Sequence, residues 1–219
     1  MDLYAYQGFI IDLDNTLILS EPFHLQAYKE ALWKLVGYCV TEADALDYHG
    51  KTTQDCAARI FAREHIDFPV QEVVDYRNAR MLEIYQNSPY PGAVEFVRWM
   101  APRVKIGIAS NSRREFVEHA LKLLGVRELL PVVVTVEDVA AHKPDPAILH
   151  EAARQMGLAP ADCLVFEDSG VGLQAILRGG YHGVLVINPR NPLPAVIPEE
   201  IDTYTWPRLL RMAQEAFPC

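Results

Sequence analysis

Acidic residues stand in two short groups that could do chemistry together. Asp12 and Asp14 lie two positions apart directly after an apolar run, and Glu167 and Asp168 follow another apolar run far along the chain. Residues two apart on a strand point to the same face, so one carboxylate of the first pair could attack an electrophile while the other handles a proton. Attack of a carboxylate on phosphorus would form an aspartyl-phosphate.

Neutral and cationic donors occupy comparable places in the sequence. Ser110 and Asn111 end a third apolar run, and Lys143 precedes a predicted helix. Carboxylates gathered at one place repel one another, and Mg²⁺ relieves that repulsion because it takes oxygen ligands and keeps several waters. The lysine would neutralise one further charge. The donors that remain suit a ligand rich in negative oxygens, such as a phosphoryl group. Capping of the following helices is the alternative role for Ser110, Asn111 and Asp168.

The elements that must position these residues alternate along the chain. Apolar runs typical of buried strands cover residues 8–14, 104–110, 130–136, 163–168 and 183–187, and helical spacing of apolar residues recurs at 115–124, 146–156 and 170–178. Buried strands that alternate with helices predict a parallel sheet covered on both faces. Ligands of such sheets bind beyond the carboxyl ends of the strands, which is where the acidic residues and the donors described above are expected.

This alternation is interrupted after the first predicted strand. Helical patterns follow one another at residues 23–36, 53–64, 70–86 and 94–100 before the second strand begins. A crossover between parallel strands needs only one helix, so the extra helices predict an inserted domain, with the chain returning at Pro89–Gly92. We expect an α/β core formed by residues 1–17 and 90–219 and a helical domain formed by residues 18–89.

The order and spacing of the motifs resemble those of the haloacid dehalogenase-like hydrolase superfamily. Asp12–Leu17 resembles its first motif, Ser110-Asn111 its second, Lys143-Pro144 its third and Glu167–Gly172 its fourth. The resemblance runs across essentially the whole chain, and four motifs in order at predicted strand ends are specific. It implies a Rossmann-like three-layer core with a parallel sheet and an inserted α-helical cap domain.

Carried over residue by residue, the resemblance implies that Asp12 is the nucleophile and a ligand of Mg²⁺. Asp14 would be the general acid that protonates the leaving group and then the base that activates water, with its backbone carbonyl on the metal. Asp168, with help from Glu167, would complete the metal site. The residues that would hold the phosphoryl oxygens are Ser110, Asn111 and Lys143.

The predicted insertion resembles the helical cap of the β-phosphoglucomutase-like subgroup, in which the cap closes over the site and selects the substrate. Ser20–His24 resembles the start of that cap and His49–Thr52 its specificity loop. His24 and Lys51 are therefore candidate substrate-binding residues, with a packed or surface role as the alternative for each.

Two positions depart from the pattern of this subgroup. Asn15 stands where glycine is common, and asparagine is tolerable there because it adopts unusual backbone angles more readily than most residues. Leu19 stands where aspartate is often found, which removes a polar group from the start of the cap. This second departure weakens a close assignment to a mutase or to a named sugar phosphatase.

The leading hypothesis is an Mg²⁺-dependent phosphatase of a small phosphorylated metabolite, such as a sugar phosphate or phosphoglycolate. Asp14 argues against the dehalogenase and phosphonate branches of the superfamily, which lack this second acid, because a phosphate ester needs its leaving group protonated. A phosphosugar mutase of the β-phosphoglucomutase type is the alternative, since it would use Asp12 and Asp14 in the same roles. An inert binding module would have lost one of the carboxylates, and none is lost.

Composition narrows the setting of this chemistry. The 219 residues carry a formal net charge of −9, so the chain has no bulk attraction for nucleic acid or anionic membranes. The four cysteines form no Cys-x-x-Cys pair, and no signal peptide or long apolar stretch is evident. We expect a cytoplasmic monomer with reduced thiols.

Overall fold

The computed structural model describes residues 1–48, 51–188 and 193–217. The chain divides into two compact units, a core unit made of Met1–Leu19 and Asn87–Cys219 and a helical unit made of Ser20–Gln86. The sequence predicts the insertion at residues 18–89, and the observed helical unit is a few residues shorter at both ends. The break in the alternation therefore coincides with a change of unit.

A parallel sheet forms the centre of the core unit. Within the described residues it has six strands in the order β3-β2-β1-β4-β5-β6. The bounds are Gly8–Ile11 (β1), Lys105–Ser110 (β2), Val132–Thr135 (β3), Cys163–Glu167 (β4), His182–Val186 (β5) and Asp202–Tyr204 (β6). Strand β1 pairs with both β2 and β4, so that Ile11 lies between Ile108 and Phe166. The residues that follow these three strands therefore meet at one edge of the sheet.

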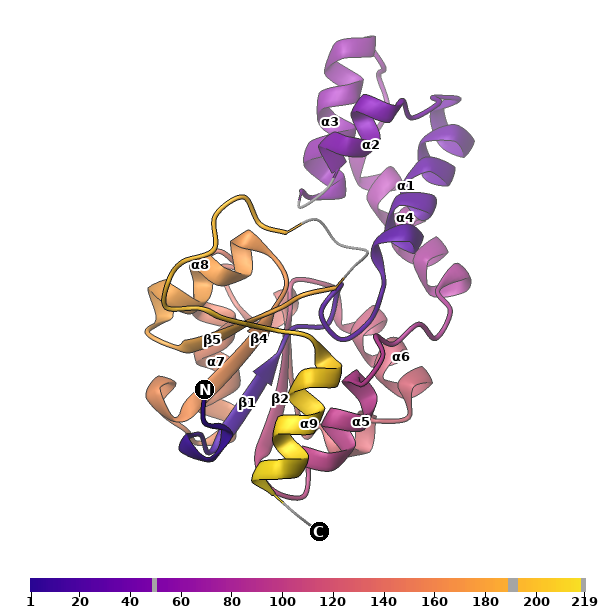
Figure 1. The fold of residues 1–219 in the computed structure, drawn as a ribbon. Coiled ribbons are helices and arrows are strands. Elements are labelled where there is room, and N and C mark those ends of the chain that lie inside the picture. The colour runs from indigo at the N-terminus through magenta and orange to yellow at the C-terminus, as the bar shows by residue number, and fades with distance from the viewer. Residues whose placement is uncertain (49–50, 189–192, 218–219) are drawn as a thin grey trace. The chain divides into compact units, whose positions relative to one another are not determined.

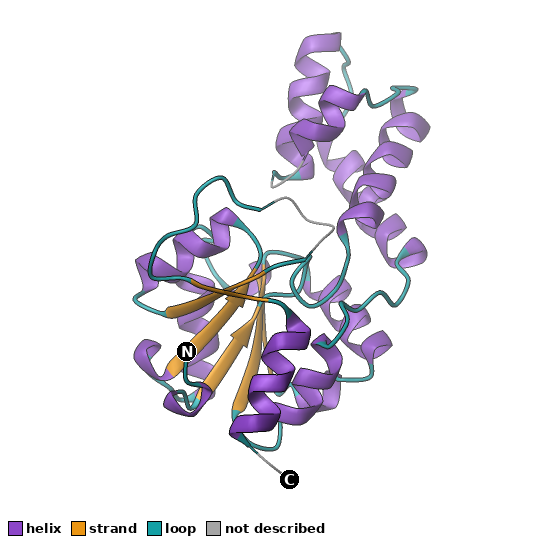
Figure 2. Ribbon diagram, viewed as in Figure 1, coloured by secondary structure: helices purple, strands orange, loops and turns teal. Residues whose placement is uncertain are grey.

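Helices cover both faces of this sheet (Figure 1; Figure 2). Their bounds are Ala93–Met100 (α5), Arg114–Leu124 (α6), Ala147–Met156 (α7), Gly170–Gly179 (α8) and Trp206–Ala216 (α9). One face packs against α7 and α8, in an apolar cluster that includes Ile10, Val165 and Leu185 of the strands. This arrangement confirms the predicted three-layer α/β fold.

Aromatic side chains fill the opposite face. Phe9 of β1 and Phe166 of β4 pack edge to face with their ring centroids 5.2 Å apart. Phe96 of α5 lies 5.9 Å from Phe9, and Trp206 of α9 lies 5.6 Å from Phe166, both in stacked geometry. Successive strand residues point to opposite faces, so Phe9 and Ile10 serve different layers.

The helical unit contains α1 (Glu21–Val36), α2 (Glu42–Tyr48), α3 (Thr53–Glu64) and α4 (Val70–Ile84). The helices predicted at 23–36, 53–64 and 70–86 are confirmed. Helix α1 ends at Gly37, whose φ of 67° suits glycine. The interior of the unit holds the stacked rings of Tyr28 and Tyr48, whose centroids are 4.3 Å apart.

Three short or C-terminal elements are absent from the sequence prediction. Helix α2 is short, and β6 has exposed residues instead of an apolar run. Helix α9 follows a proline-rich stretch, which makes its first residue difficult to predict. In the described part of the chain, none of the helices is both long and apolar enough to cross a membrane. Cys39, Cys56 and Cys163 are free thiols, and Cys219 lies outside the described residues.

Candidate active site

The first motif begins where β1 stops. The backbone N–H of Asp12 donates to the carbonyl of Phe166 at 3.0 Å, which fixes the nucleophile candidate beside the end of β4. The chain then turns, and the N–H groups of Leu17 and Ile18 both donate to the carbonyl of Leu13. Asn15 adopts a φ of 58°, the left-handed conformation that asparagine tolerates better than most residues. The departure from glycine at this position is thus accommodated by the backbone.

The fourth motif forms the junction between β4 and α8. One carboxylate oxygen of Glu167 accepts hydrogen bonds from the backbone N–H groups of Asp168 and Ser169, each at 2.8 Å, and from the Ser169 hydroxyl at 2.9 Å. A Cβ at Gly172 would lie 1.9 Å from the Glu167 carboxyl carbon, so only glycine fits there. The N-cap of α8 is Ser169, which accepts from the N–H of Gly172. The capping alternative for Asp168 is therefore wrong.

Lys143 joins the first motif to the fourth. Its ammonium donates to Asp12 Oδ1 and to Glu167 Oε1, both at 2.7 Å, and its side chain is 2% exposed. Burial alone would lower the pKa of this lysine, but the charges of Asp12 and Glu167 outweigh burial and raise it. Lys143 is therefore a fixed cation at the carboxyl edge of the sheet.

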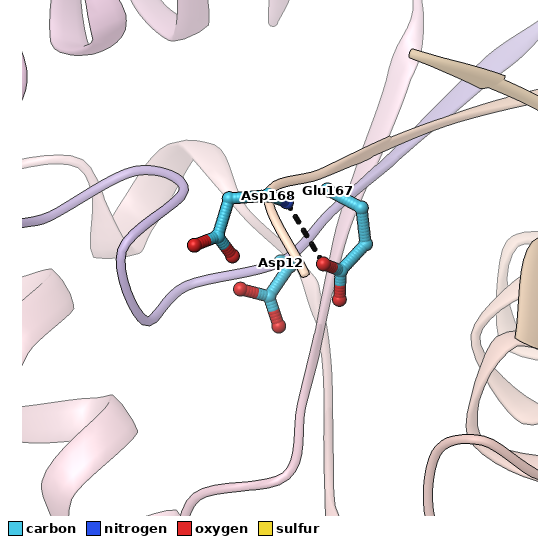
Figure 3. A group of neighbouring side chains, drawn as sticks. All are labelled: Asp12, Glu167 and Asp168. Carbon is cyan, nitrogen blue, oxygen red and sulfur yellow. Dashed lines mark hydrogen bonds between the residues drawn. The ribbon is translucent and has the colours of Figure 1, made fainter. Parts of the chain in front are cut away.

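Negative charge is in excess around this lysine. Among the described residues, Asp12, Glu167 and Asp168 offer carboxylate oxygens that all lie within 4.8 Å of one another (Figure 3). Burial raises the pKa of Asp12 to about 7; Lys143 opposes the shift, while Glu167 and Asp14 add to it. Burial and the neighbouring charges of Glu167 and Asp12 also raise the pKa of Asp168. Several carboxylate oxygens close together fit a hard divalent cation such as Mg²⁺.

Asp14 lies against the second motif. Its Oδ2 accepts the hydroxyl of Ser112 at 2.6 Å and the hydroxyl of Ser110 at 3.2 Å. Ser110 is fully buried at the end of β2, and this bond places its hydroxyl beside Asp14. Helix α6 has Arg113 as its N-cap with no side-chain hydrogen bond, so the capping alternative for Ser110 and Asn111 is wrong.

Asn111 supports the lysine segment. Its amide nitrogen donates to the carbonyl of Lys143 at 3.2 Å, and its amide oxygen accepts the N–H of Lys143 at 3.1 Å. Both ends of the side chain are thus bound to the backbone of one residue. A contact of the Asn111 amide with a phosphoryl oxygen, as predicted, would compete with these two hydrogen bonds to the Lys143 backbone.

The two candidate residues of the insertion belong to the helical unit. His24 of α1 is buried, and its Nδ1 contacts the guanidinium of Arg77 on α4. Lys51 is exposed and pairs with Asp47. His49 and Gly50 of the predicted specificity loop lie outside the described residues.

Three residues that support the first motif carry no role in the sequence analysis. The Thr16 hydroxyl donates to Asp168 at 3.0 Å, which links the first motif to the fourth. Asn188 donates to the carbonyl of Asn15 at 2.8 Å, and the indole of Trp206 donates to the carbonyl of Thr16 at 2.7 Å. The only signal in the sequence is the place of Thr16 inside the motif, because Asn188 and Trp206 come from distant segments.

Comparison with known proteins agrees with this geometry. The model of the family described as "haloacid dehalogenase-like hydrolase" matches residues 6–180 of this chain. The chain belongs to this family. The similar solved structures include CbbY from Rhodobacter sphaeroides in complex with phosphate, with a TM-score of 0.79, 20% identity and coverage of 93% of this chain and 96% of that one. A protein from Thermotoga maritima described as a "putative beta-phosphoglucomutase" superposes with a TM-score of 0.75 at 20% identity. The match covers 96% of this chain and 100% of the other. These likenesses show the fold.

Two relatives with higher identity are named as phosphatases. Validoxylamine A 7′-phosphate phosphatase of Streptomyces hygroscopicus subsp. limoneus is 30% identical over 80% of this chain and 83% of its own length. Fructose-1-phosphate phosphatase of Escherichia coli K12 is 29% identical over 82% of this chain and 95% of its own. Family membership and these relatives confirm the predicted enzyme class, a hydrolase of the phosphatase type.

Proposed function

We propose that this haloacid dehalogenase-like hydrolase is an Mg²⁺-dependent phosphatase that hydrolyses a small sugar-phosphate-like metabolite through an aspartyl-phosphate on Asp12. The observation that carries the proposal is the buried group of Asp12, Glu167 and Asp168 around one lysine. This group has more negative charge than Lys143 can balance. A divalent cation together with a phosphoryl group would complete the balance.

Asp12 is suited to attack phosphorus. Its Oδ1 is held by Lys143 at 2.7 Å, which orients the carboxylate and leaves Oδ2 as the attacking atom. A new bond forms between this oxygen and phosphorus while the bond from phosphorus to the leaving oxygen breaks. Asp14 supplies the proton that the leaving oxygen takes, and the product is a free alcohol.

Asp14 then serves the second half of the reaction. As a carboxylate it accepts a proton from a water molecule, whose oxygen attacks the phosphorus of the aspartyl-phosphate. The bond between phosphorus and the Asp12 oxygen breaks, inorganic phosphate leaves, and Asp14 is protonated again. Both halves thus use Asp12 and Asp14 once each, and atoms and protons balance over the cycle.

Asp12 and Asp168, with Glu167, would hold Mg²⁺, and the Asp14 carbonyl is a further candidate ligand. When bound, the ion would neutralise negative charge on the phosphoryl oxygens and on the carboxylates. Glu167 already accepts one hydrogen bond from Lys143 and three from the start of α8, so its carboxylate is held rigidly for this purpose. The Ser110 hydroxyl and the Lys143 ammonium are the side-chain donors for the phosphoryl oxygens.

The substrate class rests on the relatives. The two phosphatases compared above are named for fructose 1-phosphate and for validoxylamine A 7′-phosphate. We therefore favour a phosphate ester of a small sugar-like alcohol over a nucleotide. His24 and Lys51 are the proposed contacts of the helical unit with this alcohol. A phosphosugar mutase would use the same carboxylates and is the outcome against which the proposal is tested.

The test measures inorganic phosphate released from a panel of sugar phosphates, phosphoglycolate and nucleotides, once with Mg²⁺ and once with EDTA. We expect release from a narrow set of sugar phosphates, dependent on Mg²⁺. Release that persists in EDTA would contradict the role of the metal. If no compound releases phosphate but acetyl phosphate phosphorylates the protein, the mutase function would replace the phosphatase function as the conclusion.

A further inference from the structure

Ser112 lies between the end of β2 and the start of α6, and the chemistry above gives it no role. Its hydroxyl donates to Asp14 Oδ2 at 2.6 Å, a length typical of a strong hydrogen bond to a charged acceptor. The two residues are 98 positions apart in the sequence, and both follow strands that are neighbours in the sheet. The contact therefore depends on the fold of the core unit alone.

Ser110 makes the same kind of contact but has another task. Its hydroxyl donates to Asp14 Oδ2 at 3.2 Å, and its oxygen accepts the backbone N–H of Ser112 at 3.0 Å. A serine hydroxyl has one hydrogen to donate. When that hydrogen is directed at a phosphoryl oxygen, as the proposed function requires, it is no longer available to Asp14. The Ser112 hydroxyl can keep its hydrogen bond to Asp14 throughout.

The surroundings hold the backbone near Asp14, and its carboxylate accepts the hydroxyl of Ser112. The carbonyl groups of Asn15 and Thr16 are fixed by Asn188 and Trp206. The terminal torsion of an aspartate side chain is broad, so a firm backbone does not by itself set the direction of the carboxylate. The hydroxyl of Ser112 contributes to that direction, and its own backbone is held by Ser110.

We propose that Ser112 is a positioning residue for general acid catalysis: its hydroxyl directs the Asp14 carboxyl toward the leaving oxygen after phosphate has engaged Ser110. This inference rests on the proposed function. A capping role is excluded, because the N-cap of α6 is Arg113 and makes no side-chain hydrogen bond. Ser112 itself transfers no proton and binds no phosphoryl oxygen in this scheme.

The experiment compares two substrates of similar shape that differ in how much they need an acid. Phenyl phosphate has a poor leaving group, whereas p-nitrophenyl phosphate has a good one. The parameter is kcat/KM, which covers the steps up to departure of the alcohol and excludes the later attack by water. Asp14→Asn provides the reference, because loss of the acid should lower kcat/KM far more for phenyl phosphate than for p-nitrophenyl phosphate.

We expect Ser112→Ala to reproduce part of that pattern. Its loss of kcat/KM should be about tenfold larger for phenyl phosphate than for p-nitrophenyl phosphate, a fraction of what general acid catalysis contributes. Ser112→Thr keeps the hydroxyl and should restore the ratio. Ser88→Ala removes another hydroxyl hydrogen bond of the core unit, the one to the Leu19 carbonyl, and should affect both substrates equally.

Equal losses for both substrates in Ser112→Ala, or a rise in KM alone, would overturn the positioning role. Thermal unfolding of each variant establishes that it is folded, and Ser112→Cys, whose thiol is only a weak donor, carries the test if Ser112→Ala does not fold. Failure of the proposed function looks different. In that case the wild-type protein hydrolyses neither substrate with Mg²⁺, or Asp14→Asn itself shows no dependence on the leaving group.

Discussion

The core unit contains a group of neighbouring carboxylates and the helical unit contains one buried carboxylate, and the two places differ in how the charge is balanced. In the core unit, Lys143 pairs with Asp12 and Glu167, and Asp168 lies beside these two carboxylates. In the helical unit, the single carboxylate of Asp44 is surrounded by donors. The hydroxyls of Tyr38 and Thr41, the N–H of Thr41 and the guanidinium of Arg63 all donate to it.

The pKa values move in opposite directions as a result. Burial tends to raise the pKa of Asp44, but its hydrogen bonds from Arg63, Thr41 and Tyr38 outweigh burial and hold the pKa well below its usual range. In the core unit, burial and neighbouring carboxylates raise the pKa of Asp12 and of Asp168. A carboxylate held by several donors stabilises its fold, whereas carboxylates that raise one another's pKa cost stability and are available for chemistry.

The largest expected effect is on activity, and it distinguishes the role of Asp12 in catalysis from its effect on stability. We expect Asp12→Asn to lower kcat by at least about a thousandfold, because the nucleophile is lost. The same substitution should leave the Tm unchanged or raise it, because it removes a negative charge from a cluster that has an excess. Phosphate release and thermal unfolding in EDTA measure the two effects. A Tm that falls by several degrees would make Asp12 a stabilising carboxylate like Asp44.

Removal of the Lys143 ammonium should destabilise the core group of carboxylates. We expect Lys143→Met to lower the free energy of unfolding by about 3–5 kcal/mol, because it leaves buried carboxylates without their partner. Denaturant unfolding at about pH 8, above the pKa of about 7 of Asp12, measures the loss. Mg²⁺ should recover part of the stability if the carboxylates bind it. An unchanged free energy of unfolding would mean that the cluster does not depend on this lysine.

A smaller loss is expected in the helical unit, with the sign opposite to that of Asp12→Asn. Asp44→Asn should lower the free energy of unfolding by about 1–3 kcal/mol, because an amide cannot accept from all the donors that now point at Asp44. Asp47→Asn is the matched control: Asp47 is a more exposed carboxylate paired with Lys51 and Arg59. We expect no measurable change in Tm for the control.

The pH dependence sharpens this comparison. The folded pKa of Asp44 is lowered, so its contribution to stability is present above the unfolded pKa of about 4 and is lost as the pH falls below it. The difference in free energy of unfolding between wild type and Asp44→Asn should therefore shrink as the pH is lowered from about 6 to about 3. A difference that stays constant over this range would contradict the assignment of the stabilising charge to Asp44.

The sequence predicted much of the fold because its periodic patterns are strong. Strands β1 to β5 coincide with the apolar runs, and α3 has the predicted bounds, Thr53–Glu64. Elements without such a pattern were missed. Strand β6 is exposed, so no apolar run indicates it, and α2 is too short for helical periodicity to be evident.

The candidate site was predictable for the same reason and to a similar extent. Asp12, Ser110 and Glu167 lie at or directly after strand ends, and a parallel sheet brings such positions to one edge. The supporting contacts were not predictable. Thr16, Asn188 and Trp206 fix the first motif through partners that lie far away in the sequence. Their pairing depends on the order of the strands and on the packing of α9.

The sequence by itself determined which groups are present and that they gather at one edge of a sheet, because strand periodicity and motif order are local properties of the chain. Only the tertiary structure decided how those groups divide their hydrogen bonds. It joins Lys143 to both Asp12 and Glu167, commits the Asn111 amide to the Lys143 backbone, and directs Ser112 at Asp14. Distances of a few ångströms between residues far apart in the sequence follow from packing, which no local pattern encodes.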